Sequence, residues 1–181
     1  MALKATVFKV ELDIADMDRH YYQNHALTLA RHPSETDERM MVRVIAFALH
    51  ADDTLSFTRG LCADDEPELW KKDLTGEIET WIDVGLPDPR RLRKASHRAR
   101  RVYLYAFGGR AVDVWWTRHR AELTDIDNLV VRVLDPEATT ALAATVERGM
   151  RISCTLEDGQ LWFSDASGTV AVGITTLHGA G

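Results

Sequence analysis

Two acidic residues lie on neighbouring segments that the sequence predicts to be the strands of one hairpin. Residues 67–73 and 77–84 are strand candidates, and the short turn between them contains a glycine. A turn centred on Thr75-Gly76 places Glu68 opposite Asp83, with both side chains on one face. The same register predicts two further opposed pairs on that face, Trp70 with Trp81 and Lys72 with Glu79.

Metal binding is the chemistry that an opposed acid pair suggests. Two adjacent carboxylates repel each other unless a cation lies between them. A hard divalent ion such as Mg²⁺ or Mn²⁺ is bound by one or two carboxylates, with water and substrate oxygens completing its shell. Two alternatives stay open. Asp65 or Glu66 replaces Glu68 if the register slips, and Lys72 forms only a cross-strand ion pair with Glu79.

A third acid, Glu38, stands in the first turn of a helix predicted between Ser34 and about Ala51. It lies beside the apolar stripe of that helix and could lean toward the hairpin face, which would bring three acids together. The alternative is that Glu38 is simply a first-turn acid, stabilised by the helix dipole.

The charge pattern adds a basic segment directly after the acids. Residues 64–88 contain nine acidic residues against two lysines, whereas residues 90–101 contain seven basic residues and no acid. Such a segment can hold phosphate groups or nucleic acid, or it can be a solvated face that neutralises the preceding acids. The candidate phosphate ligands are Arg90, Arg91, Lys94 and Arg98.

The elements that must position these residues follow from periodicity and from turn residues. Ser34 is expected to cap the helix that carries Glu38, with Arg39 and Arg43 opposite its apolar stripe. Asp88 and Pro89 start the basic helix. The remaining elements are strands at 8–14, 26–30, 54–59, 102–107 and 129–134, helices at 111–123 and 136–148, and a three-stranded meander over 150–156, 161–163 and 170–174.

This order predicts an α/β fold on the border of α+β, in which helices flank a mixed β-sheet and the two chain ends build an antiparallel extension. The 181 residues are expected to form a single domain. The composition, 45% hydrophobic and 28% charged, excludes intrinsic disorder. No apolar run is long enough to span a membrane and no signal peptide is visible, so we expect a cytoplasmic protein.

The cysteines and histidines indicate no further site. Cys62 and Cys154 form no disulfide framework, and neither has an activating pattern expected of a catalytic thiol. The seven histidines are scattered without ligand spacing, which makes a zinc site improbable.

Two segments resemble the signature of the YaeQ family of bacterial proteins: His-Pro-Ser-Glu-Thr-Asp-Glu-Arg-Met-Met-Val-Arg at 32–43 and Trp-Ile-Asp-Val-Gly-Leu-Pro-Asp at 81–88. The resemblance implies a variant of the PD-(D/E)XK, restriction-endonuclease-like fold, with its core at about 34–107. It also implies a possible association with transcription elongation.

Carried over from that fold, Glu38 matches the helix acid, Glu68 the acid after a proline, and Asp83 the first residue of the (D/E)-x-K motif. Gly85 stands where the motif lysine belongs, so Lys72, Lys71 or an arginine of the basic helix would have to replace it. Two functions are therefore expected: divalent-metal-dependent phosphodiester hydrolysis of nucleic acid, or a nucleic-acid- or protein-binding module without turnover.

Overall fold

The computed structural model describes residues 4–60 and 64–180, and these divide into two compact units. Unit 1 comprises residues 1–41 and 137–173, and unit 2 comprises residues 42–136 and 174–181. The division falls inside α1 (Asp37–His50). A single domain over residues 1–181 stays a prediction, and each unit is described below by itself.

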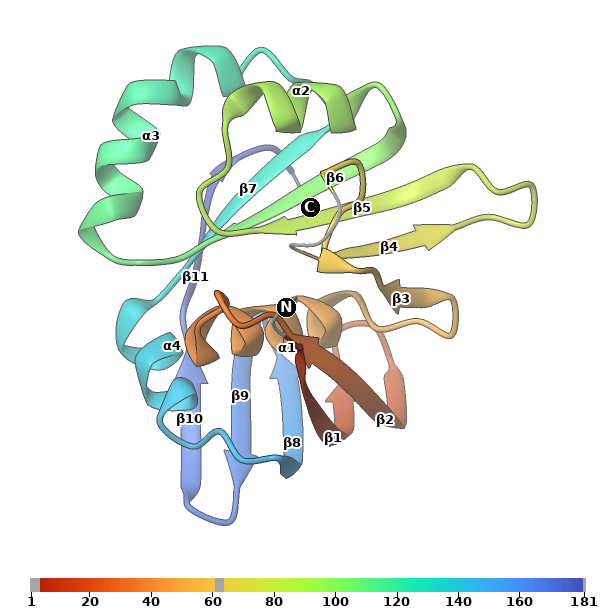
Figure 1. Ribbon diagram of the computed structural model, residues 1–181, viewed down its shortest axis with the longest axis vertical. Helices are drawn as coiled ribbons and strands as arrows, with labels where there is room; N and C mark the ends of the chain where they lie inside the picture. Colours follow the sequence, from red (N-terminus) through yellow and green to blue (C-terminus); the bar gives the residue numbers. More distant parts are fainter. Residues whose placement is uncertain (1–3, 61–63, 181) are drawn as a thin grey trace. The chain divides into compact units, whose positions relative to one another are not determined.

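Unit 1 is built on a five-stranded sheet in the order β10-β9-β8-β1-β2 (Figure 1). The predicted pairing of the first two strands is confirmed, with Val10 opposite Leu27 in an antiparallel register. The meander β8-β9-β10 supplies the rest, but it joins the first strand in parallel, with Leu12 beside Ile152. The strands are β1 (Thr6–Asp16), β2 (Tyr21–Arg31), β8 (Gly149–Glu157), β9 (Gln160–Asp165) and β10 (Gly168–Val172).

The sequence alternation of β1 explains its place in this sheet. Phe8, Val10, Leu12 and Ile14 are buried, whereas the residues between them face solvent. This is the period-2 pattern of a strand with one covered face. The short helix α4 (Pro136–Ala143) lies beside the meander (Figure 1), and its buried Leu142 lines a small pocket with side chains of β8 and β9.

Unit 2 contains a six-stranded mixed sheet in the order β11-β7-β6-β5-β4-β3. The pairs β5–β6 and β6–β7 are parallel, and the other three pairs are antiparallel. The prediction that Ile174 ends the meander is wrong, because this residue begins β11 and pairs with Leu134 of β7. The strands are β3 (Leu55–Phe57), β4 (Leu69–Lys72), β5 (Ile78–Val84), β6 (Ala99–Ala106), β7 (Leu129–Leu134) and β11 (Ile174–His178).

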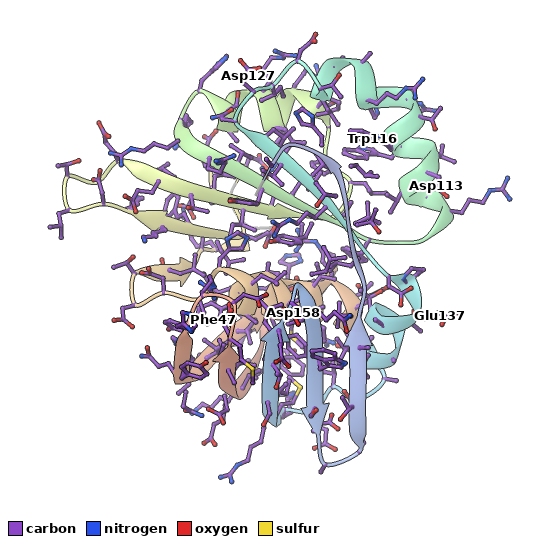
Figure 2. All side chains as sticks on the ribbon, turned by 180° about the vertical axis from the view of Figure 1, so that it is seen from behind. Phe47, Asp113, Trp116, Asp127, Glu137 and Asp158 are labelled. Atoms are coloured by element: carbon purple, nitrogen blue, oxygen red, sulfur yellow. The ribbon has the colours of Figure 1, made fainter. Side chains whose placement is uncertain are left out.

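Helices α2 (Pro89–Ser96) and α3 (Arg110–Leu123) lie over one face of this second sheet (Figure 1). Leu92 and Ala95 of α2 and Trp115 and Leu123 of α3 share one apolar cluster with the sheet, and Trp116, labelled in Figure 2, packs against that cluster. The chain order α1-β3-β4-β5-α2-β6 is the order predicted for residues 34–107. The mixed α/β class is therefore confirmed.

Helix α1 differs from its prediction at two points. Thr36, not Ser34, caps it: the Thr36 hydroxyl accepts a hydrogen bond from the Arg39 amide at 3.1 Å, and the Ser34 hydroxyl bonds the His32 ring instead. Arg43 does not face solvent as expected, because residues 40–48 are all buried and Arg43 is 3% exposed. Nine consecutive buried positions span more than two turns of the helix, so this part of α1 has no solvated face for a basic residue.

The described part of the chain contains no helix that is long and apolar enough to span a membrane. Cys154 is buried, and this burial raises the pKa of its thiol to about 12, which is the state of an unreactive thiol. Cys62 lies outside the described residues.

Candidate carboxylate site

The hairpin that carries the acid pair has the predicted register near the site. Trp70 lies opposite Trp81 and Leu69 opposite Ile82. The Glu68 amide donates to the carbonyl of Ile82 at 2.9 Å, so Glu68 stays bonded to β5 just before β4 begins, although this bond is one position out of the register of the strand pair. Glu68 and Asp83 are consequently held on adjacent segments of unit 2, and they are 4% and 2% exposed.

Farther along the hairpin the predicted register fails. A bulge between Lys71 and Lys72 shifts the pairing, so that Lys72 lies opposite Ile78 instead of Glu79. Lys71 takes the predicted partner, with its ammonium 3.5 Å from Glu79 and 3.0 Å from Asp52. The Lys72 ammonium lies 3.7 Å from the centre of the Trp70 ring.

Both carboxylate oxygens of Asp83 accept hydrogen bonds. Arg91 of α2 binds them as a fork, with Nε 3.0 Å from Oδ2 and Nη2 3.0 Å from Oδ1. The indole nitrogen of Trp81, two residues earlier on the same strand face, donates to Oδ2 at 3.1 Å. This is the bidentate geometry in which a guanidinium binds a carboxylate most strongly.

Burial dominates the protonation behaviour of this aspartate. Burial raises the pKa of Asp83, and the nearby Glu68 charge raises it further. The hydrogen bonds from Arg91 and Trp81 and the positive charge of Arg91 lower it. The net effect is a raised pKa. The pKa of Arg91 is also raised, because the Asp83 hydrogen bond and the Asp83 and Glu68 charges outweigh its own burial. Glu68 and Asp83 therefore influence each other electrostatically.

Arg91 also bonds the backbone of the acidic segment before the hairpin. Its Nη1 donates to the carbonyl of Asp64 at 2.9 Å, and its Nη2 donates to the carbonyl of Glu66 at 2.7 Å. One side chain thus connects α2, the end of β5 and the segment that leads into Glu68. The guanidinium is 28% exposed while the Asp83 side chain is 3% exposed, so Arg91 covers the carboxylate.

Glu68 has a basic neighbour of its own. Its Oε2 lies 4.0 Å from Nε of Arg43, and both side chains are 4% exposed. The Arg43 guanidinium lies 5.9 Å from the centre of the Phe57 ring. Gly60 leaves room for the carboxylate, since a Cβ at that position would lie 2.9 Å from Glu68 Oε2.

Glu38 belongs to unit 1, where its carboxylate accepts a hydrogen bond from the Thr139 hydroxyl at 2.7 Å. Its convergence with Glu68 and Asp83 stays a prediction. Within residues 4–60 and 64–180, no group of three or more histidine, cysteine, aspartate or glutamate side chains is arranged to hold a metal ion.

The basic segment is engaged largely with oxygen atoms of the chain itself. Arg90 pairs with Asp88 at 2.8 Å, and Lys94 pairs with Asp65 at 2.6 Å. Arg98 donates to the carbonyl of Asp65 at 2.7 Å. Together with the Arg91 bonds, these contacts agree with the alternative in which the basic face neutralises the preceding acids.

The backbone at Gly85 disfavours the lysine that the PD-(D/E)XK fold, as implied by the family resemblance, would place there. Gly85 has a φ of +95°, a conformation that residues with side chains rarely adopt, and its amide donates to the Tyr105 carbonyl at 3.0 Å. A lysine at this position would be strained. Among the candidates for its replacement, Arg91 contacts Asp83, whereas Lys71 binds Asp52 and Glu79.

Sequence reasoning missed Trp81 and Arg43 as members of this site. Trp81 could have been found, because its spacing of two from Asp83 puts both side chains on one strand face. Arg43 carried a weaker signal, a single base inside a run of apolar residues.

Comparison with known proteins gives a consistent result. A family model described as "YaeQ protein" matches residues 1–174. The protein named "Uncharacterized protein YaeQ" from Escherichia coli K12 is 45% identical over 175 residues, which cover 97% of each chain, and its Salmonella typhi counterpart is equally similar. The crystal structure of the YaeQ protein from Xanthomonas axonopodis pv. citri has 49% identity, a TM-score of 0.93 and coverage of 97% of this chain and 99% of its own.

The YaeQ protein from Pseudomonas syringae has 35% identity and the same TM-score of 0.93, with 97% of both chains covered. Sequence and structure thus agree over nearly the whole length. The chain belongs to the YaeQ family.

Proposed function

We propose that this chain is a non-catalytic binding module on a nuclease-like core, in which Arg91 supplies the positive charge that a divalent metal would supply in an active nuclease. The observation that carries this proposal is the two-point contact of Arg91 with Asp83. It leaves the Asp83 carboxylate covered and fully hydrogen-bonded.

The residues present fit a catalytic metal poorly. A hard cation needs oxygen ligands that it can reach, and Asp83 already directs both oxygens at Arg91 and Trp81. A metal would have to displace the guanidinium and would then lie next to it. The described residues also offer no third acidic ligand beside Glu68 and Asp83.

The backbone at Gly85 supports the same proposal. A motif lysine assists catalysis only if its side chain leaves the strand end beside the two acids. The positive φ of Gly85 disfavours any such side chain. Arg91 does not substitute for a catalytic lysine, because its donors are committed to Asp83 and to the carbonyls of Asp64 and Glu66.

Calorimetric titration with Mg²⁺ and Mn²⁺ tests the proposal. We expect no saturable binding to the wild-type protein and no difference between it and Asp83→Asn. Asp73→Asn is the matched control, because Asp73 is a carboxylate of the same hairpin that pairs with Arg100. Stoichiometric binding that is lost only in Asp83→Asn would overturn the proposal.

Metal-dependent hydrolysis of nucleic acid is the second candidate. It is favoured by the close placement of two buried acids, Glu68 and Asp83, whose charges interact. Incubation of single- and double-stranded DNA and RNA with Mn²⁺ distinguishes the two candidates. Cleavage that disappears in Asp83→Asn, but not in Asp73→Asn, would establish the enzyme.

The partner class is tested by salt dependence. Arg90, Arg91, Lys94 and Arg98 are bound to the chain's own oxygens, so we expect weak nucleic-acid binding at this helix and a protein as the partner. Association with an oligonucleotide that weakens steeply with salt, and is lost in Lys94→Gln, would reverse this assignment.

A further inference from the structure

A second cluster of polar side chains lies on the sheet of unit 2, outside the carboxylate site. Arg132 of β7 is half-buried, and its Nη1 donates to the hydroxyl of Tyr105 at 3.1 Å. The same hydroxyl lies 2.6 Å from Nε2 of His50. The Arg132 guanidinium also lies 5.6 Å from the centre of the Tyr103 ring. Three side chains from α1 and β6, namely His50, Tyr103 and Tyr105, therefore surround the positive charge of Arg132.

The positive charge of Arg132 has no acidic counterpart in the described part of the chain. The other half-buried or buried arginines of unit 2 differ: Arg43 lies near Glu68, and Arg91 is bound by Asp83. Among the residues that the structure describes, the Arg132 guanidinium contacts a neutral hydroxyl and an aromatic ring. A desolvated charge of this kind favours an anion from outside the chain.

The hydroxyl of Tyr105 cannot neutralise that charge. It is a neutral group that accepts from Arg132 at 3.1 Å and lies 2.6 Å from His50 Nε2, so it orients the guanidinium without adding a negative charge. Tyr105 is fully buried, so the side of the guanidinium that contacts its hydroxyl is closed to solvent. The Tyr105 hydroxyl holds the guanidinium in place through one N–H group, and within residues 4–60 and 64–180 the other guanidinium N–H groups have no protein acceptor.

The strand register places one further polar residue, Thr176 of the edge strand β11, next to Arg132. Tyr105, Arg132 and Thr176 are register partners on β6, β7 and β11, so their side chains form one row on one face. Thr176 is exposed and lies on the edge strand. Its hydroxyl is a second donor beside the guanidinium, at the solvent side of the row.

We propose that Arg132, with Thr176 beside it and Tyr105 and Tyr103 behind it, binds a small oxyanion, such as a phosphate or carboxylate group, through the guanidinium fork. A planar fork matches two oxygens of either group, and a neighbouring hydroxyl adds a third contact. This site is independent of the carboxylate site and does not rest on the function proposed above.

Thermal unfolding and calorimetry at constant ionic strength test the site with inorganic phosphate and, in a separate arm, acetate. We expect saturable binding of at least one anion to the wild-type protein. The uncharged variant Arg132→Met should bind it at least about tenfold more weakly, the factor expected for losing one hydrogen bond to a charged group. Arg93→Met is the matched control, because Arg93 is exposed on α2 and, within residues 4–60 and 64–180, bonds a backbone carbonyl and no carboxylate.

A response to phosphate alone identifies a phosphate site, and a response to acetate alone identifies a carboxylate site. Equal responses in the wild type and Arg132→Met, or no response beyond that to chloride, would overturn the proposal. If Arg132→Met does not fold, titration of the wild-type protein decides: the Nε–Hε resonance of Arg132 must shift with the anion, and an unchanged resonance rejects the site.

Discussion

Arg91 and Arg132 both belong to unit 2, but the guanidinium of Arg91 is paired with a carboxylate and that of Arg132 is not, among the described residues. Arg91 is bound by both oxygens of a buried aspartate and by two backbone carbonyls. Arg132 touches a tyrosine hydroxyl and a ring, and no carboxylate pairs with it among the described residues. A basic residue therefore indicates a ligand site only where the fold leaves its charge without an internal partner.

The density of basic residues along the chain does not by itself identify the arginine that is available to an external anion. The segment 90–101 has the highest concentration of basic residues, but Lys94 and Arg98 are bound to the side chain and the carbonyl of Asp65, which precedes the segment. The single arginine of β7 has no basic neighbours in its own strand. We expect an external anion at the isolated arginine and not at the basic segment.

The largest effect is expected for Arg91→Ala, which leaves the buried Asp83 charge without its partner. Removing one member of a buried ion pair typically lowers the free energy of unfolding by about 3–5 kcal/mol. Urea unfolding measures this loss, and Arg93→Ala, on the same helix, should change little. An Arg91→Ala variant as stable as the wild type would show that Asp83 does not need the guanidinium.

A double-mutant cycle sharpens the comparison between buried and exposed ion pairs. Combining Arg91→Ala with Asp83→Ala should give a coupling free energy of about 0.5–3 kcal/mol, because the two residues are in direct contact. The same cycle on Arg90 and Asp88, whose side chains are 89% and 53% exposed, should give no measurable coupling. Equal coupling free energies in both cycles would contradict the view that burial determines the strength of an ion pair.

A smaller effect is expected for Arg132→Met in the absence of anions. The change removes the hydrogen bond to Tyr105 but leaves no buried charge behind, so the free energy of unfolding should fall by no more than about 1.5–3 kcal/mol, the value of one hydrogen bond to a charged group. Urea unfolding in chloride buffer measures this. A loss as large as that of Arg91→Ala would mean that Arg132 is a structural residue and not a ligand-binding one.

The smallest effect concerns pH and separates two aspartates of unit 2. The backbone and side-chain hydrogen bonds of Thr54, aided by Lys71, lower the pKa of Asp52 to about 2. Its stabilising contribution is therefore present above the unfolded pKa of about 4 and is lost as the pH falls toward 2. Because this side chain is 37% exposed, the contribution should be about 1 kcal/mol or less.

Asp52→Asn should remove this part of the acid dependence, and the exposed neighbour Asp53 provides the control variant Asp53→Asn. The pH dependence of stability that comes from Asp83 has the opposite sign, because folding raises the pKa of this residue. Its contribution is present below the unfolded pKa and is lost as the pH rises through the folded pKa. Unfolding free energies measured between pH 2 and 7 check both directions. An acid dependence unchanged in Asp52→Asn rejects the assignment.

Local sequence determined most of the secondary structure and part of the site. Alternating apolar residues specify β1, the Asp88-Pro89 pair specifies the start of α2, and the turn at Gly76 sets Trp70 opposite Trp81. These features depend on neighbours within a few residues, so side-chain periodicity and turn chemistry are enough to predict them.

Tertiary structure alone decided which charges are neutralised. Nothing in the sequence distinguishes Arg91 from Arg90, but only Arg91 lies where its helix meets the end of β5 and can reach Asp83. The burial of Arg43 and the row that joins Tyr105, Arg132 and Thr176 also require partners distant in sequence. Electrostatic interactions depend on distance and burial in three dimensions, and local sequence patterns contain neither.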